Sequence, residues 1–274
     1  MTSTQFVIRA GTALLVGLIG CLATALAQAE DKKGFTGYLT LGGAIVPDYE
    51  GSDDYQPAPF AAGKLAYDEY YIEARGSKLR ANVMPAGVLP FGLELGPSLA
   101  YRFGRDDVKN DAVDALRDIE GTVAMGGFAK MYVKAVLDES DQLGFDVEIL
   151  SGVGSDRDGT LITFGPSYSF SPWDSLRLGF NASATYANDR YNETYFGIDA
   201  NNALRSGLAA YDAEGGIKDL GLSVNATYMM TEHWAITGNA KVMQLVGDAA
   251  DSPIVDDAGS ATQGVVALGL VFNF

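Results

Sequence analysis

The amino-acid sequence predicts an all-β fold, a transmembrane antiparallel up-and-down β-barrel of about 12 strands (10–14 are compatible). From Val266 to the terminal Phe274, apolar side chains occupy every even position, which is the period of a strand with one apolar face. After residue 27, no apolar run approaches the ~20 residues of a spanning helix. Only a closed barrel then satisfies the backbone polar groups in lipid. The alternatives are an edge strand of a soluble sheet or a soluble β-sandwich, whose strands are shorter.

The N-terminus has the pattern of a secretory signal peptide, residues 1–27. Arg9 is the first charge, an apolar stretch follows, and Ala25 and Ala27 form an A-x-A cleavage site. A membrane anchor is one alternative. Residues 18–21 also match a lipobox in which Cys21 would be acylated. Because the segment after Cys21 stays apolar, we favour cleavage, leaving a barrel domain of residues 28–274.

Composition excludes several classes of function. Cleavage after residue 27 removes Cys21, the one cysteine, and with it disulfide and thiol chemistry. The net charge of −16 argues against nucleic acid as a partner. Mean hydropathy is near zero, as expected where lipid-facing and lumen-facing residues alternate.

Period-two patterns and turn residues divide the chain into twelve strands, an even number as in bacterial single-chain barrels. They are residues 35–46, 58–67, 70–75, 78–84, 91–104, 119–136, 143–152, 159–170, 175–187, 217–230, 233–246 and 262–274. The third and fourth are short and could form one long strand.

The polar faces of these strands predict a charged lumen. Its charged residues are Glu94, Arg102, Asp146, Glu148, Arg177, Asp219 and Lys241. Both signs occur, and a buried charge without a partner is costly, so we expect neutralising pairs within a salt-bridge network or a narrow aqueous pore. The small residues Val265, Ala267 and Gly269 of the last strand would leave room in the lumen.

The connections between strands are of two kinds. Short turns fall at residues 68–69, 85–90, 138–142, 171–174 and 232, and tight turns near 76–77 and 156–158. Long acidic segments fall at 47–57, 105–118, 188–216 and 247–261. If both termini are periplasmic, every long segment lies outside the cell. The short turns are flanked by aromatic residues suited to an interfacial girdle, namely Tyr67, Tyr70, Phe170, Trp173, Tyr228 and Trp234.

The chain offers little catalytic chemistry. His233 is the single histidine, and its short periplasmic turn lacks the paired nucleophile that hydrolases need. We therefore predict no catalytic residue, no cofactor and no metal site. An outer-membrane hydrolase is the alternative, and loss of a lipase or protease activity on substituting His233 would support it. The acidic runs around Asp48 and Asp248 are interpreted as solvated loops, not as sites for calcium or for cations that bridge lipopolysaccharide.

Short motifs along the whole expected mature chain resemble those of the MipA/OmpV family of outer-membrane proteins. The residues that carry the resemblance are Pro47, Asp48, Tyr49, Gly51, Ser52, Gly96, Pro97, Arg102, Arg105, Tyr195, Phe196, Gly197, Ser206, Gly207, Asp251, Ser252 and Pro253. Each motif alone is weak, but their order between a signal peptide and a terminal Phe is fairly specific.

The resemblance implies a barrel without known catalytic residues in the outer membrane of a Gram-negative bacterium. The family's name member links a murein lytic transglycosylase to a murein synthase, and other members are immunogenic outer-membrane proteins or adhesins. The scaffold role has no motif that can be carried over residue by residue. Expected partners are outer-membrane lipid, lipopolysaccharide and the barrel assembly machinery, which would read Phe272 and Phe274.

The sequence is therefore compatible with three functions. The first is a non-enzymatic scaffold for peptidoglycan enzymes, although short periplasmic turns offer little of the ~1,200 Å² that a specific interface needs. The second is a channel for small solutes through the lumen. The third is an adhesin that uses segment 188–216, although aromatic residues such as Tyr191, Tyr195 and Phe196 more often pack within a loop cluster.

Overall fold

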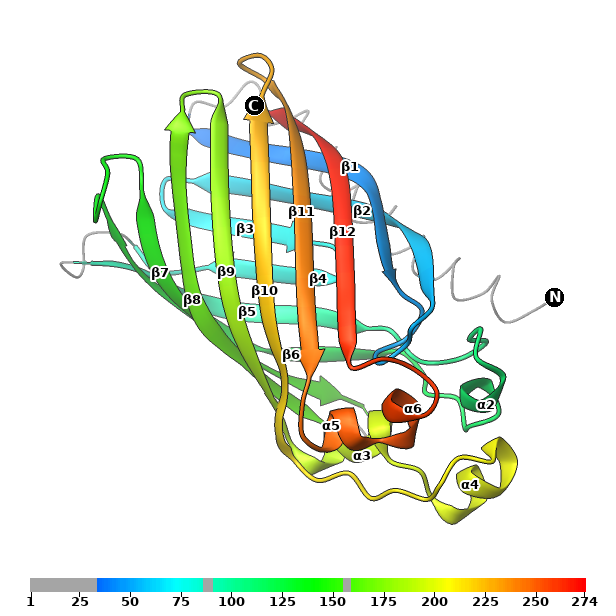
Figure 1. The fold of residues 1–274 in the computed structure, drawn as a ribbon. Coiled ribbons are helices and arrows are strands. Elements are labelled where there is room, and N and C mark those ends of the chain that lie inside the picture. The colour runs from blue at the N-terminus through cyan, green and yellow to red at the C-terminus, as the bar shows by residue number, and fades with distance from the viewer. Residues whose placement is uncertain (1–33, 86–90, 155–158) are drawn as a thin grey trace.

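A computed structural model describes residues 34–85, 91–154 and 159–274. Twelve strands form one closed antiparallel barrel in which β1 pairs with both β2 and β12 (Figure 1). The strands are β1 (Phe35–Pro47), β2 (Tyr55–Tyr67), β3 (Tyr70–Arg75), β4 (Lys78–Asn82), β5 (Gly92–Arg102), β6 (Thr122–Lys134), β7 (Gln142–Val153), β8 (Thr160–Trp173), β9 (Leu176–Ala187), β10 (Gly216–Met229), β11 (Trp234–Leu245) and β12 (Thr262–Asn273). The predicted fold class and strand number are confirmed.

Some expectations concern other parts of the chain. The signal peptide, Cys21 and the turn at 156–158 lie outside the described residues, as does most of the turn at 85–90. Within the described ranges, the helices are all too short or too polar to cross a membrane.

The barrel closes at its chain ends. The Gly37 amide donates to the Phe274 carbonyl, and the Phe274 amide donates to the Gly37 carbonyl, both at 3.1 Å. A Cβ atom at Gly37 would lie 2.2 Å from the carbonyl oxygen of Lys64 and 2.6 Å from the Phe274 ring. Glycine is therefore required at this seam, where the terminal aromatic ring crosses β1.

Side chains alternate between lipid and lumen around the barrel. Leu41 pairs with Leu270, and both side chains are exposed on the outer wall. Their neighbours Thr40 and Val271 also pair, but they point inward and are buried. The register places all seven predicted lumen charges on the inward face.

The observed strands differ from the predicted ones mainly at their ends. β2 begins at Tyr55, because Pro57 and Pro59 do not stop its pairing with β1. β8 continues to Trp173 through a register shift after Phe170. β3 and β4 are separate strands joined by a turn in which Gly76 has φ of 56°.

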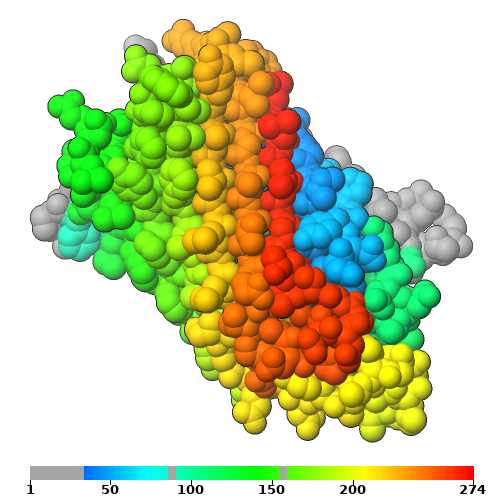
Figure 2. Space-filling model, viewed as in Figure 1, coloured from blue at the N-terminus to red at the C-terminus, as the bar shows by residue number. Residues whose placement is uncertain are grey.

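The four long segments all lie at one end of the barrel, as predicted, but they contain helices that the sequence did not predict. These are α2 (Asp111–Asp114), α3 (Asp189–Phe196), α4 (Ala200–Ser206), α5 (Asp248–Asp251) and α6 (Pro253–Asp256). The side chains of Asn110, Asn188, Asp199 and Ser252 cap four of them. In Figure 2, the α4 region and the α5–α6 region form one continuous mass at the end opposite the C-terminus.

Candidate functional site

The long segments pack into a structure that we call the outer cap, residues 48–54, 105–121, 188–215 and 247–261. It has two apolar clusters. The first contains Ala187, Tyr191, Phe196, Ala213, Leu245, Ala249 and Val255, and the second contains Tyr49, Val113, Leu116, Ile198, Ile254 and Ala258. Because each cluster draws on several segments, the cap is a folded unit and not a set of independent loops.

Hydrogen bonds join distant segments of the outer cap. The Tyr49 hydroxyl donates to the Ala258 carbonyl at 2.9 Å. Gln263 Nε2 donates to the Ser52 carbonyl at 3.0 Å, and its Oε1 accepts from the Gly51 amide at 3.3 Å. Gly51 has φ of +100°, and a Cβ atom there would lie 2.6 Å from Val255 Cγ2. The β1–β2 loop is thereby held against the segment before β12.

Arg105 is the buried cation of the outer cap. It is 8% exposed, and its Nη1 donates to the Tyr195 carbonyl at 2.8 Å. Its Nε has no hydrogen-bond partner among the described atoms. Burial lowers the pKa of Arg105 to about 10, so the group stays charged at neutral pH. Burial also raises the pKa of the nearby Tyr49 to about 12.

An ionic centre lies directly beneath the outer cap. Lys218 sits at the register shift between β9 and β10, with a side chain only 4% exposed. Its Nζ contacts Glu50 and lies 2.6 Å from Asp219 Oδ2. The Tyr191 hydroxyl donates to Glu50 at 2.9 Å, and the Thr185 hydroxyl donates to Asp219 at 3.0 Å. This centre joins the β1–β2 loop, α3 and β10 at the outer mouth of the barrel.

The lumen below contains further charge networks. Glu148 accepts from Lys78 at 2.5 Å, from Arg80 at 3.0 Å and from Ser98 at 2.7 Å. The Tyr71 hydroxyl donates to Glu94 at 2.6 Å. The expected neutralising pairs therefore exist for part of the predicted set.

The three predicted lumen cations, Arg102, Arg177 and Lys241, form no ion pair with an acid among the described residues. Arg102 donates to the carbonyls of Gly159 and Leu150, each at 2.8 Å. The opposite wall is lined by half-buried polar side chains, including Asn181, Ser183, Ser223, Asn225 and Asn239. The lumen thus combines salt bridges with a water-accessible polar lining.

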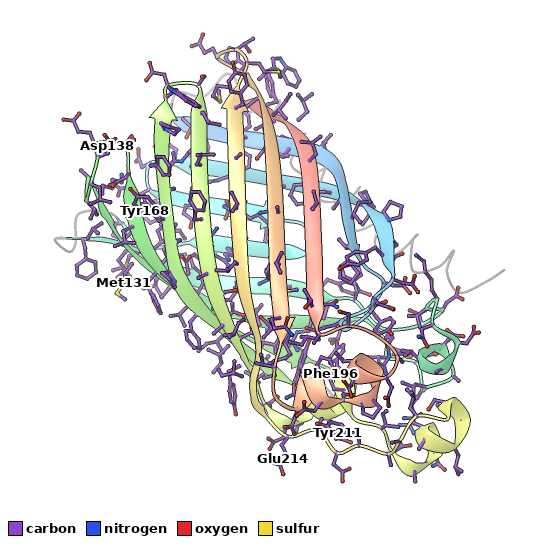
Figure 3. All side chains as sticks on the ribbon, in the orientation of Figure 1. Met131, Asp138, Tyr168, Phe196, Tyr211 and Glu214 are labelled. Carbon is purple, nitrogen blue, oxygen red and sulfur yellow. The ribbon has the colours of Figure 1, made fainter. Side chains whose placement is uncertain are left out.

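The end of the barrel opposite the outer cap, which the sequence predicts to face the periplasm, carries an ordered turn between β6 and β7, which we call the rim turn, residues 135–141. The carboxylate of Asp141, itself buried, accepts from the amides of Val136 (2.7 Å), Leu137 (2.8 Å) and Asp138 (3.2 Å). The Tyr168 hydroxyl donates to the same carboxylate at 2.9 Å. Figure 3 shows Asp138 and Tyr168 at the end of the barrel opposite Phe196. Leu137, at the tip of the turn, is 84% exposed.

Exposed aromatic side chains, which suit the membrane interface, surround the same end of the barrel. The predicted girdle residues Tyr67, Tyr70, Trp173, Tyr228 and Trp234 are all exposed on the outer wall. His233 lies in the last short turn, with Nδ1 3.2 Å from the Asn273 carbonyl and its ring 6.1 Å from that of Phe272. These contacts are structural and include no nucleophile.

The structure brings many of the motif residues together. Tyr49, Gly51, Ser52, Arg105, Tyr195, Phe196, Ser252 and Pro253 lie in or against the outer-cap core, and Arg102 lies just below it. Pro47, Asp48, Gly197 and Asp251 lie at its edges, and Ser206 and Gly207 end the outlying α4. Gly96 and Pro97 instead lie in the wall, where a Cβ atom at Gly96 would meet the Ala81 carbonyl at 1.9 Å.

Sequence reasoning missed the key polar residues. Lys218 was not singled out, and Glu50 was interpreted only as part of the solvated acidic run around Asp48, because these two partners lie far apart in sequence. Asp141 looked like one more acidic turn residue. The local signal of the register shift is the break in alternation from Ile217 to Leu220, where two polar residues separate two exposed apolar ones.

A family model described as MltA-interacting protein MipA matches residues 39–274. The chain belongs to this family. The MltA-interacting protein of Escherichia coli K12 is 28% identical to it over 86 residues, 31% of this chain and 33% of that protein. The putative outer membrane protein YiaT of E. coli K12 is 31% identical over 77 residues, 28% of this chain and 31% of that protein. The chain thus matches about a third of the length of these relatives.

Solved barrels resemble this MipA-family chain in fold. The NanC porin has a TM-score of 0.44 at 9% identity, covering 85% of this chain and 98% of the porin. An outer-membrane channel from Pseudomonas putida F1 has a TM-score of 0.46 at 12% identity, covering 88% of this chain and 96% of the channel. At this level the likeness concerns the barrel alone. The barrel and the family place the protein in the outer membrane of a Gram-negative bacterium.

Proposed function

We propose that this MipA-family barrel is a non-enzymatic scaffold that docks peptidoglycan enzymes at its periplasmic rim. The name of the E. coli relative, MltA-interacting protein, supports a murein lytic transglycosylase as one partner. A murein synthase would be the second, following the family resemblance.

The packed outer cap supports an activity on the periplasmic side. Lys218, Glu50 and Tyr191 tie the β1–β2 loop, α3 and β10 together beneath a packed outer cap. The cap surface is rich in carboxylates, and Leu204 is its one large exposed apolar side chain among the described residues, whereas the rim turn presents Val136 and Leu137 next to each other, ahead of Asp138 and Glu139. Because protein interfaces are centred on desolvated apolar anchors, the rim is the better docking surface.

The rim turn is the observation that carries the proposal. Three amides and a tyrosine hydroxyl bind one carboxylate of Asp141, so the loop is preorganised. Ala135 holds a positive φ of 57° at its start, an unusual conformation for a residue with a Cβ atom. A fixed loop loses little entropy on binding, which offsets the small area that a short turn can bury.

The test is affinity capture of the tagged barrel from envelopes at native expression, after reversible cross-linking. We expect a lytic transglycosylase and a murein synthase in the eluate. A tagged barrel of another family, captured in parallel, controls for envelope proteins that bind any barrel. An eluate without either cell-wall enzyme contradicts the proposal.

A solute channel is the second candidate, favoured by the half-buried polar lining of Asn181, Asn225 and Asn239. Conduction would require the outer cap to open. In planar bilayers the scaffold proposal predicts a silent wild-type protein, because Lys218 and its carboxylates hold the outer cap together at the mouth. A steady single-channel current from the wild type would favour the channel instead.

A further inference from the structure

The barrel wall is shorter between β2 and β5 than elsewhere. The hairpin of β3 and β4 reaches only as far as Ala61, whose carbonyl accepts from the Gly76 amide at 2.9 Å. On the other side, the Tyr101 amide donates to the Ser77 carbonyl at 2.9 Å. Beyond this point residues 55–60 of β2 pair with β1 alone, among the residues that the structure describes. Figure 1 shows β3 and β4 ending before β2 and β5 do. We call this interruption the lateral notch.

The sequence of β2 is adapted to the lateral notch. The Ala61 carbonyl points toward β3, so in an antiparallel strand the backbone groups of Pro57 and Pro59 point the same way. Proline has no amide hydrogen, and so these two positions leave no unpaired donor at the open edge. An unpaired amide facing lipid would cost several kcal/mol. The two prolines therefore lower the cost of leaving this edge of β2 unpaired, and Lys109 Nζ donates to the Tyr55 carbonyl at the far end of the edge, at 2.6 Å.

A cavity of about 160 Å³ lies just inside the lateral notch. Ser77 and Tyr101 form its lip, and Ala100, Leu150 and Leu161 supply an apolar lining. At the lip, the Tyr101 ring meets the exposed Phe103 ring edge-to-face, with centroids 5.3 Å apart. A ligand here would meet apolar and aromatic groups along its way from the membrane.

The charged residues of the cavity favour an anion. Lys78 is neutralised by Glu148, at 2.5 Å. Among the described residues, Arg102 donates to two backbone carbonyls, and its guanidinium carbon lies 5.3 Å from the centre of the Tyr191 ring. The guanidinium charge is therefore uncompensated by any described carboxylate in contact with it. Guanidinium groups recognise carboxylate and phosphate oxygens well.

We propose that this cavity binds the anionic head group of an outer-leaflet amphiphile, whose apolar chain leaves through the lateral notch into the membrane. The charge of Arg102 selects the head group, and the lining of Leu150 and Leu161 receives the first carbons of the chain. The volume of about 160 Å³ suits a head group and a few carbons, and not a whole lipid. This site is independent of docking at the periplasmic rim.

The test is photo-cross-linking of the full mature barrel in zwitterionic lipid vesicles. The probe is a C18 fatty acid with a diazirine near its carboxyl end, and the matching fatty alcohol is the uncharged control. We expect acid-dependent, saturable labelling of peptides containing Ser77, Ala100 or Leu161. Labelling by the alcohol should be about tenfold weaker, as expected for loss of a charge-assisted hydrogen bond.

Two pairs of variants locate the site. Arg102→Gln should reduce labelling by the acid to the level of the alcohol, whereas Arg177→Gln, a lumen arginine elsewhere, should not. Ala100→Trp should fill the cavity and abolish labelling, whereas Ala267→Trp on β12 should leave it unchanged. Heat-dependent electrophoretic mobility confirms that each variant is folded. Equal labelling by acid and alcohol, or labelling confined to outward-facing residues, would overturn the proposal.

Discussion

The Oγ of Ser252 lies 2.6 Å from the carbonyl oxygen of Phe196, 56 residues away in sequence. The same Oγ accepts from the Ile254 amide at 3.3 Å and so caps α6. One buried hydroxyl therefore satisfies a carbonyl at the end of α3 and an amide at the start of α6. These two helices come from different segments of the outer cap.

Replacing Ser252 with Ala should loosen the outer cap without unfolding the barrel. The change leaves a buried carbonyl unsatisfied and removes a helix cap, at a cost of about 1–3 kcal/mol. Hydrogen exchange in segments 188–216 and 247–261 should accelerate, while exchange in the strands stays slow. Ser260→Ala, at a half-buried position where the hydroxyl bonds only to the nearby Thr262 backbone among the described residues, is the matched control. Unchanged protection in both segments would contradict the role assigned to Ser252.

Gly51→Ala should strain the contact between the β1–β2 loop and α6. The residue has φ of +100°, and the new Cβ would lie 2.6 Å from Val255 Cγ2. We expect a loss of about 1–3 kcal/mol in cap stability. Because Val255 is buried, the double variant is compared with Val255→Ala alone, and in that background Gly51→Ala should cost only the backbone strain. The rate of proteolysis of the outer cap at low protease concentration measures the stability of each variant. Equal rates for Gly51→Ala and the wild type would contradict the predicted strain.

Lys218→Met should destabilise the outer mouth strongly. The change leaves Asp219, which is itself buried, and Glu50 without their cation, at a cost of about 3–5 kcal/mol. Denaturant unfolding in detergent micelles measures the effect. Lys241→Met removes a lumen lysine that has no ion pair among the described residues, so its effect should be smaller. Similar losses for the two variants would argue against an ionic centre held together by Lys218.

The rim turn should depend on pH through Asp141. Burial raises the pKa of this carboxyl, but hydrogen bonds from Val136, Leu137 and Tyr168 outweigh burial and leave the pKa below its ordinary value. Because the pKa is lower in the folded protein, the carboxylate stabilises the turn fully at pH values above the ordinary aspartate pKa. This stabilisation is lost as the pH falls through the lower pKa of the folded protein.

The amide chemical shift of Leu137 reports this transition in NMR spectra of the protein in micelles. It should stay constant as pH falls into the ordinary aspartate range and change only below it. Asp141→Asn should remove the transition. A midpoint at or above the ordinary aspartate value in the wild type would contradict the hydrogen-bonding pattern.

Strand positions could be predicted from sequence because each strand has its own alternation, fixed by lipid on one side and lumen on the other. The outer cap could not, since α3 and α6 are short and are held by contacts such as Ser252 with Phe196. Likewise, nothing near Lys218 in sequence indicates that Glu50 would neutralise it. Arg102 was correctly placed on the lumen face, but its carbonyl partners depend on barrel closure.

The most direct test of the scaffold compares two exposed leucines at opposite ends of the molecule. Leu137 on the rim turn is 84% exposed, and Leu204 on α4 of the outer cap is 86% exposed. The measurement is the affinity of the captured lytic transglycosylase for the purified barrel with Leu137→Lys or Leu204→Lys. Docking at the rim predicts at least about tenfold weaker binding for Leu137→Lys, the loss expected for an apolar anchor, and wild-type binding for Leu204→Lys. Wild-type affinity for Leu137→Lys, or a loss confined to Leu204→Lys, would contradict it.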